Sequence, residues 1–312
     1  QSFEVHKQVS PVEYPSLVSE NIDIHWKPNI DLMHVENIDK PFAMYDGEAM
    51  LNGGVDLEPK GLSGNGSMKF GEAEMISDLM VYGEHSFDAD TAEFKLSTDS
   101  LKELAFKTVN VNAHIDFEER KGVFTSNGEG SFVDFPANQY FCFVDQFTWF
   151  MDKGDIELSA TSQTTAIEGE EDVKLEGSEF ISTHPKQDSL KFIAPRAQYN
   201  VRKSIIYAKE VQLINVADAR IYPDNGDVTI HKKARMETLE NAKIMANVVT
   251  RFHNMYNCTV DIKAKKMYKA VGDYDYIDEK NEKQVIHFDE ITVDTTAQTY
   301  AVGKIADNAG FK

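Results

Sequence analysis

The feature that most constrains the fold is a long alternation of apolar and polar residues, which runs through residues 188–230 as "DSLKFIAPRAQYNVRKSIIYAKEVQLINVADARIYPDNGDVTI". Turn residues such as Asp224-Asn225-Gly226 divide this stretch into short runs. Successive side chains of a β-strand point to opposite faces, so a period of two predicts half-buried strands joined by hairpins. The same alternation runs through 75–135. We therefore expect an all-β fold, an elongated stack of antiparallel strands with very little helix.

Two stretches leave room for another interpretation. Residues 233–247, "KARMETLENAKIMAN", are rich in helix formers, but their apolar positions make no helical stripe and both flanks alternate, which favours a strand. Residues 64–71, "GNGSMKFG", could form a phosphate-binding loop or a nucleophile turn, yet they match neither motif. We expect a glycine-rich β-turn there.

The composition divides the chain into three parts. Residues 1–45 hold four of the nine prolines, and proline cannot donate to a strand ladder, so we expect an extended lead-in or edge segment. Residues 46–165 are expected to form a first β-rich unit, and residues 166–312 a second one continuous with it. The chain begins without Met and ends in "DNAGFK", which suggests a piece of a longer protein.

The charge narrows the range of partners. The 312 residues carry a formal charge of −20, which disfavours nucleic acid and anionic lipid surfaces, because both attract basic proteins. No apolar stretch approaches the length of a membrane-spanning helix, so we expect no transmembrane segment.

A family resemblance rests on "LKFIAPRAQYNVRKSIIYAKEVQL", which carries an Ala-x-Tyr pair, a turn and then an Ile-x-Ala strand. This pattern resembles the repeat of the OstA-like lipopolysaccharide-transport proteins, most clearly over 188–230 and more faintly over 70–160. The resemblance implies a β-taco or β-jellyroll, a grooved sheet of stacked antiparallel strands. The family's Gly-Asn-Val unit is Lys209-Glu210-Val211 here, and the turns are more acidic than an acyl-chain carrier needs. The alternation also resembles large cell-envelope proteins of the Bacteroidetes, which implies an extracytoplasmic location.

The densest aromatic segment, residues 135–158, offers a candidate ligand site. Both faces of the run "NQYFCFVDQFTWF" are largely apolar, which predicts a central buried strand in which Phe141 and Phe143 matter strongly for stability. The alternative is a stacking platform for sugars that uses Phe147 and Trp149.

The acidic turn "GDYDYIDEKNE", residues 272–282, offers a candidate metal site. Asp273, Asp275 and Asp278 could converge on Ca²⁺, although the spacing is not that of an EF-hand. The alternative is a hairpin with an acidic solvent face. Cys142 and Cys258 form no CxxC motif, and a single bridge between them stays open.

The sequence matches no nucleophile, metal-ligand or cofactor motif, so we expect a non-enzymatic module without a cofactor. The predicted function is a cell-envelope scaffold or binding module. One alternative is a lipid-conducting or lipopolysaccharide-conducting β-taco, and another is a carbohydrate-binding or carbohydrate-active β-protein. The segment "ITVDTTAQTYAVGK" alternates with Ile291, Val293, Thr295, Ala297 and Thr299 on one side. We expect this C-terminal edge to continue into other segments or protein partners by strand addition.

Overall fold

The chain is all-β in the computed structural model, which describes residues 2–98, 103–160, 164–166, 174–247, 249, 253–277 and 281–304. Strands make up 66% and helical turns 3%. Within the described residues there is no α-helix, only the 3-10 turns η1 (Pro28–Ile30), η2 (Tyr45–Gly47) and η3 (Asp224–Gly226). The strand pairings are antiparallel. The all-β prediction is therefore confirmed.

Two compact units divide the chain. Unit 1 comprises residues 1–136, 144–158 and 200–203, and unit 2 comprises 137–143, 159–199 and 204–312. The first 45 residues thus belong to unit 1 and contribute buried side chains to it, among them Leu17, Val35 and Phe42.

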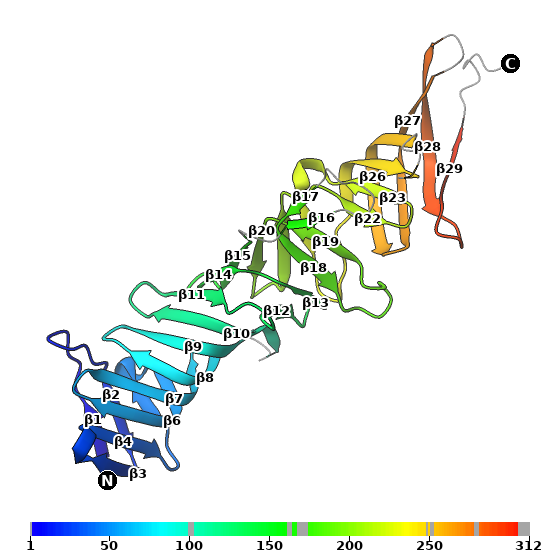
Figure 1. Ribbon diagram of the computed structural model, residues 1–312. Helices are drawn as coiled ribbons and strands as arrows, with labels where there is room; N and C mark the ends of the chain where they lie inside the picture. Colours follow the sequence, from blue (N-terminus) through cyan, green and yellow to red (C-terminus); the bar gives the residue numbers. More distant parts are fainter. Residues whose placement is uncertain are drawn as a thin grey trace. The chain divides into compact units, whose positions relative to one another are not determined.

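Unit 1 is built mainly from a meander of long strands (Figure 1). Its strands are β1 (Ser2–Val5), β2 (Leu17–Glu20), β3 (Ile22–Lys27), β4 (Leu32–Asn37), β5 (Phe42–Met44), β6 (Ala49–Glu58), β7 (Gly61–Phe70), β8 (Ala73–Tyr82), β9 (Ser86–Ser97), β10 (Leu104–Asp116), β11 (Lys121–Ser126), β12 (Phe132–Phe135), β14 (Gln146–Phe150) and β15 (Asp155–Ser159).

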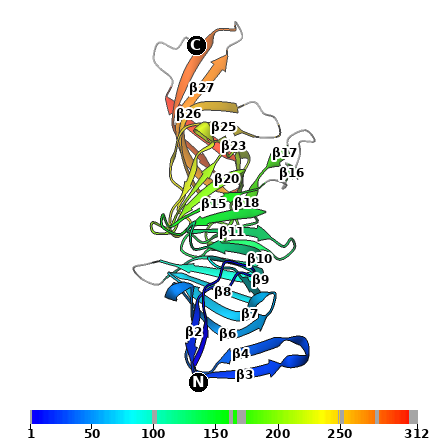
Figure 2. The ribbon, with the colours of Figure 1, turned by 90° about the vertical axis from the view of Figure 1, so that its left-hand side faces the viewer.

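The register of this meander sorts the side chains into two faces. Met33, Leu57, Leu62, Tyr82, Phe87 and Ile115 form one row across the paired strands. The neighbouring row is His34, Asp56, Ser63, Val81, Asp88 and His114. Because the strand period is two, the first row faces the interior and the second faces solvent. The strands of unit 1 curve as they stack, as Figure 2 shows.

The interior of unit 1 is filled with aromatic rings. Phe124 and Phe147 stack with their ring centroids 4.4 Å apart and their planes 9° apart. The buried rings around them are Phe70, Phe87, Phe94, Phe106, Phe117, Phe135 and Trp149. Apolar burial on this scale is the main stabilising contribution to the unit.

The prediction of a turn at 64–71 is wrong, because residues 64–70 lie inside β7 and only Gly71 belongs to the turn that follows. Gly66 faces Gly53 of β6 across the pair, and both have positive φ angles, +127° and +155°. A Cβ atom on Gly66 would overlap the carbonyl oxygen of Asn52, and one on Gly53 would overlap that of Asn65. The glycines therefore serve a close approach of two strands, not a loop.

Unit 2 contains shorter strands followed by a seven-stranded meander, β22 to β29, in which β22 pairs with β23, β23 with β25, and each later strand with the next. Its strands are β13 (Tyr140–Cys142), β16 (Thr164–Ala166), β17 (Lys174–Glu176), β18 (Ser178–Ser182), β19 (Lys191–Ala194), β20 (Arg196–Asn200), β21 (Ile205–Lys209), β22 (Ile214–Val216), β23 (Ala219–Tyr222), β24 (Val228–Ile230), β25 (Leu239–Ala246), β26 (His253–Ala264), β27 (Met267–Ile277), β28 (Lys283–Val293) and β29 (Thr299–Lys304). The ambiguous stretch 233–247 contains β25, so the strand interpretation is confirmed.

The aromatic run is not one central strand, as the sequence predicted. It forms β13 and β14, which are separated by residues 143–145. Tyr140 and Cys142 are buried, whereas Phe143 is 40% exposed and Phe141 is half-buried. Phe143 leaves the core because the chain bends between the two strands, so the prediction that Phe143 is a stability-determining core residue is wrong.

The C-terminal segment also differs from the prediction. Ile291 and Thr299 do not lie on one continuous strand, because Asp294 to Gln298 turn the chain from β28 into β29. The Asp294 carboxylate accepts hydrogen bonds from the backbone amides of Thr296 and Gln298, at 2.8 and 3.0 Å. An aspartate at the start of a turn stabilises it in this way, and it explains why the alternation conceals a hairpin.

Candidate functional site

Two of the three predicted calcium ligands lie on one face of β27, where neighbouring strands already supply partners. The Asp273 carboxylate accepts hydrogen bonds from the ring of His287, at 2.7 Å, and from the amide of Asn257, at 3.1 Å. These contacts lower the pKa of Asp273, and the hydrogen bond from His287 has the larger effect. The third candidate, Asp278, lies outside the described residues.

Asp275 is held in the same manner. Its carboxylate lies 2.6 Å from the ammonium of Lys283 and accepts a hydrogen bond of 2.6 Å from the Tyr256 hydroxyl. Both contacts lower the pKa of Asp275. Among the described residues, no group of three or more His, Cys, Asp or Glu side chains could hold a metal ion. The calcium site stays a prediction, and the arrangement of Asp273 and Asp275 is that of a cross-strand polar network.

The predicted ligand-binding aromatics both lie in the interior of unit 1. Phe147 is 2% exposed and packs against Phe124, while Trp149 is 5% exposed and packs against Phe70 and Phe94. Phe147 offers no exposed face on which a sugar could stack and Trp149 is almost entirely buried, so both occupy core positions. Cys142 and Cys258 are buried thiols with no bridge between them.

An open sheet edge is the most distinctive feature of unit 1. The hairpin strand β3 pairs with β4 through six residues, from Ile22 opposite Asn37 to Lys27 opposite Leu32. No other strand of the described chain pairs with β3, which lies at one end of unit 1 in both views (Figures 1 and 2). An edge strand exposes a row of unpaired backbone N–H and C=O groups, which is a template for another strand.

The inner face of this edge is apolar and uncovered. Trp26 is 65% exposed and lies opposite Met33, so it extends the interior row of unit 1 by one strand. Ile24, two residues earlier on the same face, is 37% exposed. Neighbouring apolar side chains that are exposed to solvent beside an unpaired strand mark a candidate interaction site.

A groove of about 560 Å³ adjoins Trp26. Its lining combines apolar, aromatic and acidic side chains: Glu4, Val5, His6, Gln8, Tyr14, Trp26, Asp31, Met33, Leu57, Glu58 and Pro59. Tyr14 is fixed by a hydrogen bond of 2.9 Å from its hydroxyl to the carbonyl of Glu58. The groove therefore presents a preformed apolar floor beside the open edge.

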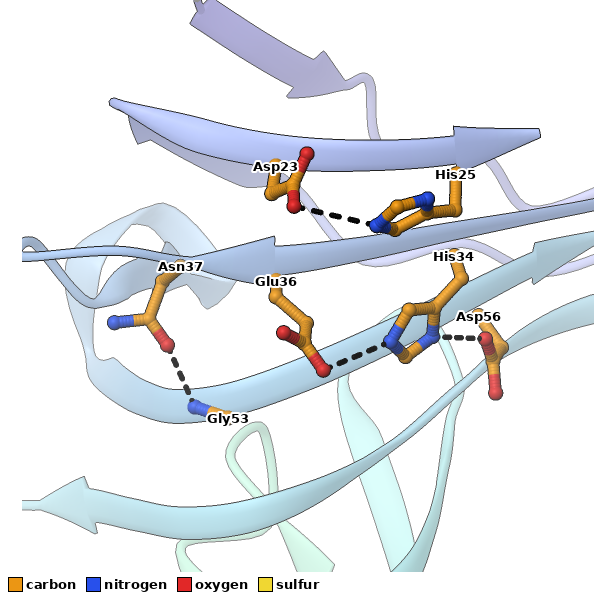
Figure 3. Close-up of polar contacts among 7 residues, drawn as sticks. All are labelled: Asp23, His25, His34, Glu36, Asn37, Gly53 and Asp56. Atoms are coloured by element: carbon orange, nitrogen blue, oxygen red, sulfur yellow. Dashed lines mark hydrogen bonds and ion pairs between the residues drawn. The ribbon is translucent and has the colours of Figure 1, made fainter.

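The outer face of the same edge carries histidines and carboxylates, as Figure 3 shows. His34 lies between Asp56, whose carboxylate is 2.6 Å from its Nδ1, and Glu36, whose carboxylate is 3.2 Å from its Nε2. His25 lies opposite His34 in the strand pair and contacts Asp23 at 3.2 Å. The two carboxylates beside His34, Asp56 first, raise the pKa of its imidazole.

Within the described residues, neither His25 nor His34 hydrogen-bonds to a serine, threonine or cysteine. The contact of His34 with Asp56 instead joins β4 to β6, whereas those of His25 with Asp23 and of His34 with Glu36 lie within β3 and within β4. The backbone amide of Gly53 adds a further tie by donating to Asn37 at 2.7 Å.

The sequence analysis expected an extended lead-in or edge segment at residues 1–45, but it did not identify β3 as the open strand, because it considered chiefly the prolines of this part. Pro28 begins the turn between β3 and β4, and β3 itself contains no proline. The available signal was the alternation of Ile22, Ile24 and Trp26, which is a short period-two run.

Unit 2 has an edge of its own at β29. This strand pairs with β28 from His287 opposite Lys304 to Val293 opposite Thr299, and Tyr300 and Val302 are exposed on it. Thr299 is anchored, because its backbone amide donates to the Asp218 carboxylate at 2.9 Å. The C-terminal edge therefore begins at a fixed residue and carries exposed apolar side chains.

This sequence matches no family model, and the curated proteins and the solved structures contain no significant match to it. No helix of the described chain is long and apolar enough to cross a membrane.

Proposed function

We propose that the chain is a non-enzymatic β-scaffold module of a bacterial cell envelope, extracytoplasmic, that joins neighbouring β-strand modules by strand addition at β3 and β29. The observation that carries this proposal is β3, a six-residue edge strand whose inner-face Trp26 is 65% exposed. Strand addition uses main-chain hydrogen bonds for affinity and side-chain contacts on alternate residues for specificity. The unpaired backbone of β3 can form the main-chain hydrogen bonds, and Ile24 and Trp26 can make the side-chain contacts.

The packing of unit 1 supports a scaffold over a lipid conduit. A conduit for acyl chains requires an open apolar channel along the interior of the sheet. In unit 1 the corresponding positions are occupied by buried rings, such as Phe94, Phe124 and Phe147, which pack against one another. A filled core of this kind resists deformation and keeps the edge strands in fixed positions.

Charge shapes how such modules associate. Each copy carries −20, so two copies repel one another at low salt. Added salt screens this repulsion, because the Debye length falls from about 30 Å at 0.01 M to about 8 Å at 0.15 M. We expect end-to-end association to strengthen as salt rises.

The experiment compares two isoleucine substitutions by sedimentation velocity over a range of protein and salt concentrations. Ile24→Lys places a charge on the inner face of the edge strand, and charge is a common protection against edge-to-edge pairing. Ile30→Lys makes the same change in the turn η1, at a residue that is 62% exposed and outside β3. The native chain and Ile30→Lys are expected to associate, and Ile24→Lys is expected to associate less, because only its β29 edge stays open.

Two results argue against the proposal. If the native chain is monomeric at every protein and salt concentration, strand addition at these edges is contradicted. Equal association of the native chain and both variants would move the contact away from β3.

A second candidate function, carbohydrate binding, has an observation in its favour. Trp26 is exposed, and Asp31 and Tyr14 line the same groove, a combination that suits the apolar face and hydroxyls of a sugar. Titration with soluble glycans separates the two functions. Loss of glycan binding in Trp26→Ala with retention in Ile24→Lys would favour carbohydrate, whereas no glycan-dependent change in Trp26 emission excludes it.

A further inference from the structure

A partly enclosed cavity of about 240 Å³ lies within unit 1, separate from the β3 edge. It opens where several hairpin turns of the meander come together. Its lining is formed by Glu48, Phe70, Gly71, Glu72, Leu96, Ser97, Phe117, Arg120, Trp149, Met151, Gly154, Val201 and Arg202. The floor is aromatic, since Phe70, Phe117 and Trp149 are all buried.

The sequence explains why space remains beside these rings. Phe70 lies between Ala49 and Ala73 on the two adjacent strands, so its cross-strand neighbours are small. The space at Gly122, opposite Trp149, is taken by the Ile115 side chain, since an added Cβ would come within 2.8 Å of it. The small neighbours of Phe70 therefore leave the volume that the unit does not fill with its own side chains.

The rim of the cavity is charged, and its Arg120 guanidinium is already paired with carboxylates. The Arg120 guanidinium donates to the Glu48 carboxylate at 2.7 Å and to the Asp152 carboxylate at 3.2 Å. Arg202 donates to the carbonyl of Asp152 at 3.0 Å. A guanidinium held between two carboxylates offers little attraction to an anionic ligand. The rim thus favours an uncharged compound.

We propose that this cavity is a binding site for a small, uncharged, apolar ring compound. An apolar cavity of about 150 Å³ can stay dry and bind benzene, so the larger volume here suits one or two fused rings. The ring lies against Phe70, Phe117 and Trp149, and its edge faces the Glu48–Arg120 pair. Burial of apolar ligand surface stabilises the complex, and the aromatic floor adds ring contacts. This site does not depend on strand addition at β3.

The test uses fluorobenzene, which fluorine NMR detects in free and bound form. Saturable line broadening is expected with the native chain. In a Trp26→Phe background Trp149 is the remaining tryptophan, so a saturable change of its emission places the probe at the cavity. At about tenfold excess over the dissociation constant, the thermal midpoint should rise by roughly 3–5 °C.

Variants at Met151 make the test specific. Met151→Trp enlarges a lining side chain into the cavity and is expected to weaken fluorobenzene binding by about tenfold or more, which is about 1.4 kcal/mol. Met151→Ala enlarges the cavity and should keep binding, and Met151→Phe provides a smaller filling change if the tryptophan variant does not fold. Met50→Trp is the matched control, since Met50 is an exposed residue of β6 outside the cavity lining.

Three outcomes overturn the proposal. Absence of saturable fluorobenzene binding shows that the cavity is only a packing gap. Equal binding by the native chain and both filling variants, Met151→Trp and Met151→Phe, places the probe elsewhere. Saturable binding of methyl glucoside or of benzoate at the cavity, with no binding of fluorobenzene, replaces the uncharged apolar ring with a sugar or an anion.

Discussion

Truncation of Phe147 should be among the most destabilising single changes in unit 1. Full burial of a phenylalanine contributes about 1.5–3 kcal/mol, and Phe147 is 2% exposed. Its ring stacks on Phe124 at 4.4 Å and packs against Phe106 at 5.2 Å, and aromatic pairs add about 0.5–1.5 kcal/mol. With the residual cavity included, Phe147→Ala should lower the free energy of unfolding by about 3–5 kcal/mol.

Phe150 provides a matched control on the same strand. It lies on the opposite face of β14, is half-buried, and carries the Lys153 ammonium 5.2 Å from its ring centre. Phe150→Ala should cost about 1 kcal/mol, because its ring is only partly buried and leaves no enclosed cavity. Urea unfolding followed by Trp149 emission in the Trp26→Phe background measures both changes in unit 1. Equal losses of stability for the two variants would refute the assignment of inner and outer faces in this unit.

The remaining predictions concern local interactions. Asp56 and Glu36 raise the pKa of His34 above the ordinary histidine value of 6.5. The stabilisation by the protonated imidazole and these carboxylates is therefore fully present below pH 6.5 and is lost as the pH rises through the raised pKa of His34. Hydrogen exchange of β4 should therefore differ between the native chain and His34→Gln at low pH and converge at high pH. Gly66→Ala should destabilise unit 1 by about 1–3 kcal/mol in urea unfolding, since its Cβ meets the opposite backbone; an unchanged midpoint contradicts the close approach. The hydrogen bond to Asp275 raises the pKa of Tyr256 to about 12, so ultraviolet titration should show one tyrosine that ionises at lower pH in Asp275→Asn than in the native chain.

The sequence predicted the fold class and most strands because alternation reports directly which face of a strand is buried. The prediction from sequence was wrong where the same residues are compatible with two local structures. The glycines at 64 and 66 look like a turn, and only their partners on β6 reveal that they serve a close strand approach. Asp294 caps a turn in a segment whose alternation does not change, so the pattern alone could not reveal the hairpin.

The candidate sites were harder to predict than the fold. Phe147 and Trp149 share a face, as period two requires, but the sequence could not say whether that face meets solvent or other rings. Trp26 is 65% exposed, and this exposure follows from the pairing of β3 with a single neighbour, β4. The number of neighbours is a property of the sheet topology. Whether a strand lies at the edge of a sheet depends on which strands pair with it. Alternation shows which face of a strand is buried, but it does not show how many neighbours the strand has.

Hydrogen exchange of the β3 and β29 amides, followed as protein concentration rises, tests the proposed edge contacts most directly. In a dilute chain, the alternate β3 amides that do not donate to β4 should exchange rapidly, as should those of β29 that do not donate to β28. If copies join through these edges, the same amides become protected as concentration and salt increase, and Ile24→Lys removes that protection at β3. Full protection of β3 and of residues 288–302 in a strictly monomeric chain would show that both edges are already closed, and would contradict the scaffold account.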